Sequence, residues 1–230
     1  MAALARQNSS RQLVGGTLAN DVLHRLRDDI ISGTLAPDEK LRFDMLRTIY
    51  GASFSTMREA LSALASEGLV EGSGQRGFRV AEVSRDDLMD LTEARVLVER
   101  EVLARSMKFG DDNWEANLLA AYHRLDRAAQ RGIGNYHLNK EWAQLHKEFH
   151  EAFAAACQSP TLMSFRNNLF ERAHRYRCLA ALAPNPVRDK NNEHRELTEL
   201  AIRRNPDALD LVAKHIRGTT QNVLSLLQMD

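Results

Sequence analysis

One short segment of this 230-residue chain breaks an otherwise helical pattern and divides the sequence in two. Residues 69–83, LVEGSGQRGFRVAEV, place apolar and polar side chains in short runs around a glycine-rich turn at 72–77, which predicts two short antiparallel strands. From residue 84 onward, apolar positions recur at helical spacing. The order predicts a mainly α protein, in which a small mixed domain precedes an all-helical one.

Three helices are predicted before the hairpin. Apolar residues recur at helical spacing over residues 18–31, and a short helix at 43–50 is predicted to turn Leu46 and Ile49 inward. Ser53 is predicted to cap the third helix. Helix, short helix, tight turn, helix and hairpin is the order of a winged helix-turn-helix.

The expected domain boundaries follow from this division. Residues 1–16 are predicted to be a flexible tail, 17–81 a winged helix-turn-helix and 82–230 a helical domain. The tail lacks the apolar core of a signal peptide, and no run approaches the ~20 apolar residues of a membrane span. The two cysteines, Cys157 and Cys178, form no CxxC pair, which favours a reducing cytoplasm.

Six helices are predicted in the second domain. Their approximate bounds are 84–109, 112–130, 136–158, 160–182, 187–204 and 206–228. Ser84 with Asp87 resembles a capping box at the start of the first of them.

The start of the third helix carries side chains that suit DNA. Its hydroxyls and free N–H groups suit phosphate oxygens, and Arg58 can offer a bidentate fork to guanine. The hairpin tip is small and cationic, as expected of a wing. The predicted DNA-binding residues are Ser53, Phe54, Ser55, Thr56, Arg58, Gln75, Arg76 and Gly77. The first 80 residues are nearly neutral, however, so an ordinary helical domain with a surface loop fits the same pattern.

Three stretches resemble the GntR family of bacterial transcription regulators: DVLHRLRDDIISGTLAPDEKL, GASFSTMREALSALASEGLV and QRGFRVAEVS. The family usually has G-V-S-R-T-P-V-R-E-A-L, then L-x-x-E-G-L-V and R-G-F-x-V. Here Phe54 replaces the usual Arg and Thr56 the frequent Pro. The resemblance implies a homodimer on a palindromic double-stranded operator, and Phe54 implies that an apolar contact replaces a polar one.

The segment LHKEFH places His146 and His150 on one face of a helix, where both can reach one metal ion. In the HExxH zinc peptidases a glutamate follows the first histidine, but here a lysine does. Glu148 is rotated about 200° from His146, so a hydrolase would lack its base. His194 and His215 lie in apolar stripes of later helices, which fits core histidines as well as ligands.

Residues 84–230 resemble the FCD domain, the effector-binding domain of the FadR-like branch of the family, beginning with DLMDLTEARVLVE at 87–99. A metal-binding subset carries D-x-x-x-H in the fourth helix and one histidine in each of two later helices. His146 stands where most relatives have Asp. The implied metal ligands are therefore His146, His150, His194 and His215. Four imidazoles suit Zn or Ni better than Mg or Ca.

The resemblance also implies an effector, and the metal favours a small carboxylate. Arg95 occupies the family's first-helix Arg position and is a candidate clamp for a second carboxylate, with an ion pair to Glu99 as the alternative. Arg175, Tyr176 and Arg177 are candidates to line the same cavity, with a solvated helix face as the alternative.

Two other functions fit parts of the pattern: a metalloenzyme built on the four histidines, and a metal- or acid-binding module with a vestigial winged helix. The segment PDEKLR at 37–42 and the HxxxH pair are similar to repressors of glutarate and 2-hydroxyglutarate catabolism.

Overall fold

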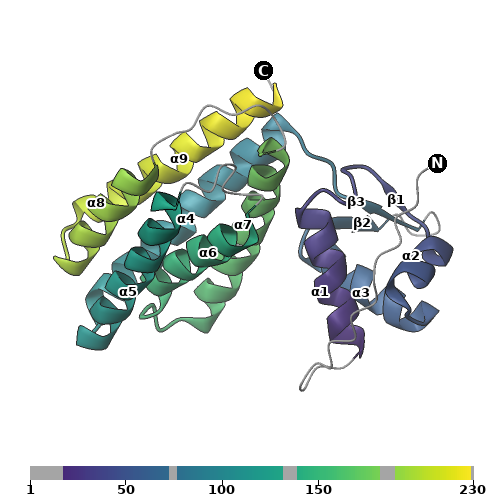
Figure 1. Ribbon diagram of the computed structural model, residues 1–230, viewed down its shortest axis with the longest axis horizontal. Helices are drawn as coiled ribbons and strands as arrows, with labels where there is room; N and C mark the ends of the chain where they lie inside the picture. The colour runs from purple at the N-terminus through teal and green to yellow at the C-terminus, as the bar shows by residue number, and fades with distance from the viewer. Residues whose placement is uncertain (1–17, 73–76, 132–138, 182–189, 229–230) are drawn as a thin grey trace.

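The structure is a computed structural model that describes residues 18–72, 77–131, 139–181 and 190–228. The predicted tail at 1–16 and two predicted wing residues, Gln75 and Arg76, lie outside the described residues. Figure 1 shows a small unit of helices and short strands beside a larger bundle of helices. The prediction of a mainly α chain with a winged helix-turn-helix at its N-terminal end is confirmed.

The small unit contains three helices and a three-stranded sheet. Its elements are α1 (Leu18–Ile31), β1 (Lys40–Leu41), α2 (Phe43–Tyr50), α3 (Phe54–Ser66), β2 (Val70–Gly72) and β3 (Phe78–Val80). The predicted hairpin is present, because β2 and β3 pair antiparallel with Val70 opposite Val80. Strand β1 adds to the other edge of β3, giving the order β1-β3-β2. Two residues are too few to show an alternating pattern, so β1 could not be predicted from periodicity.

One prediction for α2 is wrong. Leu46 is buried as expected, but Ile49 is 52% exposed and Tyr50 is buried instead. Leu46 and Tyr50 are four residues apart and share a helical face, whereas Ile49 lies about 100° away from Tyr50. The Tyr50 hydroxyl donates a hydrogen bond of 2.6 Å to the Asp29 carboxylate of α1, which holds α2 in this orientation.

A tight turn sets the angle between α2 and α3. Gly51 ends α2 with a φ of 67°, a left-handed conformation that glycine adopts without steric cost. The Ser53 hydroxyl then accepts a 3.2 Å hydrogen bond from the N–H of Thr56, so the predicted cap is present. Both features fix where the first turn of α3 points.

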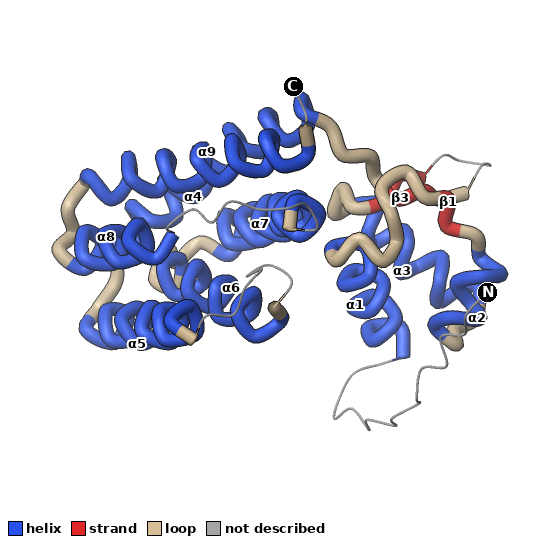
Figure 2. Tube along the Cα trace, turned by 45° about the horizontal axis from the view of Figure 1, so that its top comes forward, coloured by secondary structure: helices blue, strands red, loops and turns tan. Residues whose placement is uncertain are grey.

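Six helices form the bundle in the described part of the second domain. They are α4 (Arg85–Phe109), α5 (Asp112–Gln130), α6 (Lys140–Ala154), α7 (Pro160–Ala180), α8 (Lys190–Ile202) and α9 (Asp207–Leu227). Helix α4 packs against α7 and α9, and α5 packs against α6 and α8; Figure 2 shows this arrangement. Among the described helices, none has the length and apolar character required to cross a membrane.

The start of α4 differs from a capping box. The Ser84 hydroxyl accepts a hydrogen bond from the N–H of Asp87, as expected. The N–H of Ser84, however, donates to the hydroxyl of Tyr176, and the Asp87 carboxylate accepts from the same hydroxyl at 2.7 Å. The shorter aspartate side chain therefore ties α4 to α7 instead of closing the box.

Candidate metal and effector site

Four histidines meet inside the bundle. His146 and His150 lie one turn apart on α6, His194 lies on α8 and His215 on α9, and all four are buried. Their candidate ligand nitrogens lie within 4.8 Å of one another. The Nε2 atoms of His146 and His150 are 3.2 Å apart. The structure thus brings together all four residues predicted as metal ligands.

Neighbouring side chains orient these rings for coordination. The Nδ1 atom of His215 lies 2.7 Å from a Glu193 carboxylate oxygen, so in the tautomer with its N–H at Nδ1 the ring would coordinate a metal through Nε2. Trp142 stacks on His146 with ring centroids 4.6 Å apart. Burial holds the pKa of His150 well below its usual range, and nearby histidines act in the same direction.

The donor set fits a transition metal. Neutral imidazoles offer lone pairs, and a carboxylate behind one ligand is a common companion of metal-bound histidine. Nitrogen ligands without any carboxylate in the set favour Zn or Ni over Mg or Ca. Glu148 lies outside this cluster, where it accepts from Gln144 at 2.9 Å and lies 3.9 Å from Arg124.

Two predicted effector residues open onto the same cavity. Arg95 of α4 and Arg177 of α7 line it together with His146, His150 and His215. The free space between these side chains is only about 10 Å³, room for about one water molecule, so a bound ligand would require them to move apart.

The cavity carries an excess of positive charge. Arg95 does pair with Glu99, at 3.4 Å, but its Nε has no hydrogen-bond partner among the described residues. The Nε and Nη2 atoms of Arg177 also lack one within that part of the chain. Burial, together with nearby Arg95, lowers the pKa of Arg177 to about 9. Buried donors without acceptors are costly, so an anion that accepts from them would be stabilised.

Arg166 is a third buried cation that the sequence interpretation missed. It is 1% exposed and its Nε lies 3.3 Å from the second Glu99 oxygen. The guanidinium groups of Arg95, Arg166 and Arg177 all lie within 5.4 Å of the centroid of the Phe170 ring. Arg166 and Arg177 are eleven residues apart, about three helical turns, so this spacing was the available signal.

The other two predicted effector residues do not reach this cavity. The Arg175 guanidinium donates to the carbonyl oxygen of Ala81, just after β3, and Tyr176 bonds to Ser84 and Asp87. Successive helical residues project about 100° apart, so Arg175 and Arg177 point to opposite sides of α7. Arg175 and Tyr176 belong to the contact between the two domains.

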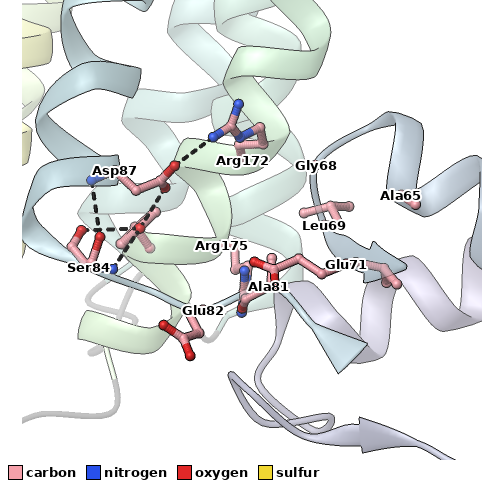
Figure 3. A pocket seen from close by; sticks show the side chains of 12 residues that line it. Ala65, Gly68, Leu69, Glu71, Ala81, Glu82, Ser84, Asp87, Arg172 and Arg175 are labelled. Carbon is pink, nitrogen blue, oxygen red and sulfur yellow. Dashed lines mark hydrogen bonds and ion pairs between the residues drawn. The ribbon is translucent and has the colours of Figure 1, made fainter. Parts of the chain in front are cut away.

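That contact surrounds a pocket of about 450 Å³, shown in Figure 3. Helix α1 packs against α7 beside this pocket without lining it. Arg172 pairs with Asp87 at 2.8 Å and also lies beside Gly68, directly after α3. The Asn168 side chain donates to the carbonyl oxygen of Glu67, the C-terminal cap of α3, at 3.0 Å. Helix α7 therefore holds both the end of α3 and the connection between the domains.

The predicted DNA-binding residues of α3 gather at its first turns. Ser53, Phe54, Ser55 and Arg58 are exposed, and Thr56 is partly buried. The Ser53 hydroxyl lies 2.9 Å from the hydroxyls of both Ser55 and Thr56. Among described residues, none pairs with Arg58. Gly77 has a φ of 88° at the end of the wing turn, where a side chain would be strained.

Comparison with known proteins agrees with this geometry. Residues 18–80 match the model of the bacterial regulatory proteins of the gntR family, and residues 90–218 match the FCD domain. The HTH-type transcriptional regulator BphR of Paraburkholderia xenovorans (strain LB400) is 37% identical over 88% of this chain and 84% of its own length. The HTH-type transcriptional repressor GlaR of Escherichia coli (strain K12) is 36% identical over 83% of this chain and 89% of its own length.

A solved structure shares the fold across both domains. E. coli McbR/YncC has a TM-score of 0.74 and 21% identity, covering 93% of this chain and 99% of its own. A winged helix-turn-helix joined to an FCD domain defines a DNA-binding transcription regulator rather than an enzyme. The chain belongs to the GntR family of bacterial transcription regulators, in its FadR-like branch with an FCD domain.

Proposed function

We propose that the protein is a homodimeric repressor of a palindromic operator, controlled by a small dicarboxylate that binds beside a Zn or Ni ion. The observation that carries this proposal is the pairing of four buried imidazoles with two buried guanidiniums, Arg95 and Arg177, around one small cavity. The identity with the repressor GlaR supports repression. A two-fold symmetric dimer matches a palindromic site because each protomer reads one half.

The charges of the cavity select the effector. Four neutral imidazoles would leave the charge of a bound dication uncompensated, so the loaded site would attract one carboxylate of the effector. The unpaired donors of Arg95 and Arg177 suit a second carboxylate. A neutral ligand would leave the charge of the metal uncompensated and would accept less strongly from the guanidinium donors of Arg95 and Arg177.

Calorimetry on the full-length protein tests the effector. We expect dicarboxylates such as succinate, glutarate and adipate to bind at least about tenfold more tightly than valerate, because charge-assisted hydrogen bonds contribute ~1.5–3 kcal/mol. Arg177→Met should remove this preference by a similar factor. Arg217→Met is the matched control, since Arg217 is exposed and pairs with Glu93.

Removing the metal tests the contribution of the ion to effector binding separately from that of the arginines. Dicarboxylate affinity should fall sharply in stripped protein, whereas operator affinity in the absence of effector should change much less. Equal affinity in the stripped and loaded protein, or a preference for an uncharged ligand such as a sugar, would contradict the proposed effector site and leave DNA binding unaffected.

Helix α7 provides a route from the cavity to the DNA domain. Arg177 faces the cavity, while the adjacent Tyr176 and Arg175 hold Ser84 and the Ala81 carbonyl. An effector that draws Arg177 inward would move α7 and shift these contacts. The end of α3 would move as well, because Asn168 of α7 bonds to the Glu67 carbonyl there. Such a shift biases the spacing of the two α3 helices in the dimer, which is allosteric coupling through a two-state interface.

Tyr176→Phe tests this route, since it removes only the hydroxyl that bonds to Ser84 and Asp87. In the absence of DNA, the variant should bind the effector with an affinity within about twofold of the parent's. In the parent, the effector changes operator affinity by some factor, and in the variant this factor should be at least about five-fold smaller. The control is Tyr122→Phe, because Tyr122 packs on Phe149 far from the domain contact. An unchanged ratio in Tyr176→Phe would exclude the hydroxyl from the coupling.

A further inference from the structure

Phe54 is an exposed aromatic residue at the first position of α3, and the core does not need it. Half of its surface is exposed, whereas the buried stripe of α3 consists of Met57, Ala60, Leu61 and Leu64. Phe54 and Arg58 are four residues apart, so they lie on the same exposed side of α3, next to that stripe. A DNA surface that Arg58 contacts would therefore also contact Phe54.

Neighbouring aromatic rings hold Phe54 in place. Its ring centroid lies 4.4 Å from that of Phe43, the first residue of α2. Phe43 in turn contacts Phe78 of β3, edge to face, at 6.1 Å. The three rings connect the beginnings of α2 and α3 with the wing. Because Phe54 is braced in this way, a contact to its outer face loses little side-chain entropy.

We infer that Phe54 recognises a thymine in each operator half-site through the C5-methyl group, next to the base pair that Arg58 reads. The inference rests on the proposed placement of α3 in the major groove. A phenyl ring cannot donate or accept a hydrogen bond with a base edge, and the thymine methyl is the one apolar group that unmodified bases present there. Ser53 and Ser55 flank Phe54 with hydroxyls that suit the phosphates on either side.

Deoxyuridine provides the test, because it differs from thymidine only by that methyl. An operator is selected from a random duplex library with the full-length protein, and each symmetric pair of thymines is then replaced by deoxyuridine. For one pair we expect binding to weaken about four-fold per half-site, or about 15-fold in total, which corresponds to removing one buried methyl from each half. In Phe54→Ala this cost should vanish, while in Phe54→Leu part of it should remain.

Ile49→Ala is the matched control, since Ile49 is a similarly exposed apolar residue on α2, and it should retain the full deoxyuridine cost. The inference is overturned if no thymine shows a cost that depends on Phe54. It is also overturned if Phe54→Ala weakens every duplex equally, or changes only the oligomeric state. Failure to select any operator would instead contradict the proposed function, so the two failures are distinguishable.

Discussion

His150→Ala is expected to abolish tight metal binding and to remove the response of thermal stability to chelation. His150 touches the other three members of the cluster, with its ring centroid 4.5 Å from that of His146 and 5.7 Å from those of His194 and His215. A metal bound at these residues would hold α6, α8 and α9 together. At 100 to 1,000 times its dissociation constant, the ion would stabilise the fold by ~2.7–4.1 kcal/mol.

The measurements are metal content by mass spectrometry and melting temperature with and without EDTA. For a chain of this size, ~2.7–4.1 kcal/mol corresponds to a fall of roughly 5–15 °C on chelation. The variant should melt at one temperature in both conditions, whatever its own stability. His123→Ala, which changes an exposed histidine, should keep the parent's response.

His146→Asp separates ligand loss from a packing defect, because an aspartate there can still coordinate. This variant is expected to retain metal, with a shift towards ions that accept oxygen ligands. Purified parent protein without transition metal, combined with no rise in melting temperature on adding Zn or Ni, would rule out the site.

Periodicity and caps were enough to predict most of the fold. Helices α2 and α5 have the bounds expected from their apolar spacing, and Ser53 caps α3 as its position suggested. The expected start of α6 at 136 was too early, since Asn139 caps the helix through the N–H of Trp142. Strand β1 exists only because β3 offers it an edge, and such a tertiary cause leaves no local pattern.

The site was only partly predictable. The His146–His150 pair follows from local spacing, but nothing local connects it to His194 and His215, which meet it through the packing of α8 and α9. Those two were assigned through the family resemblance. Arg175, Tyr176 and Arg177 are adjacent, and only the rotation of α7 about its axis decides that Arg177 alone of the three faces the cavity.

Arg58→Ala is expected to abolish specific operator binding while leaving metal content and melting temperature unchanged. Arg58 is exposed and lies outside the buried stripe of α3, so its loss leaves no cavity. A bidentate contact to guanine discriminates by ~1–3 kcal/mol, and a dimer loses two of them. The expected loss of affinity is therefore roughly 30-fold to 25,000-fold for the selected operator, and far less for unrelated DNA.

Arg58→Lys distinguishes hydrogen bonding from charge. Lysine keeps the positive charge but not the planar fork, so a base contact predicts that most of the specificity is lost, whereas a phosphate contact predicts that most is kept. Affinities for operator and random duplex are measured at matched salt, because ionic strength changes both. If Arg58→Ala bound its operator as tightly as the parent, α3 would not be the reading helix, and the contact assigned to Phe54 on the same face would fail with it.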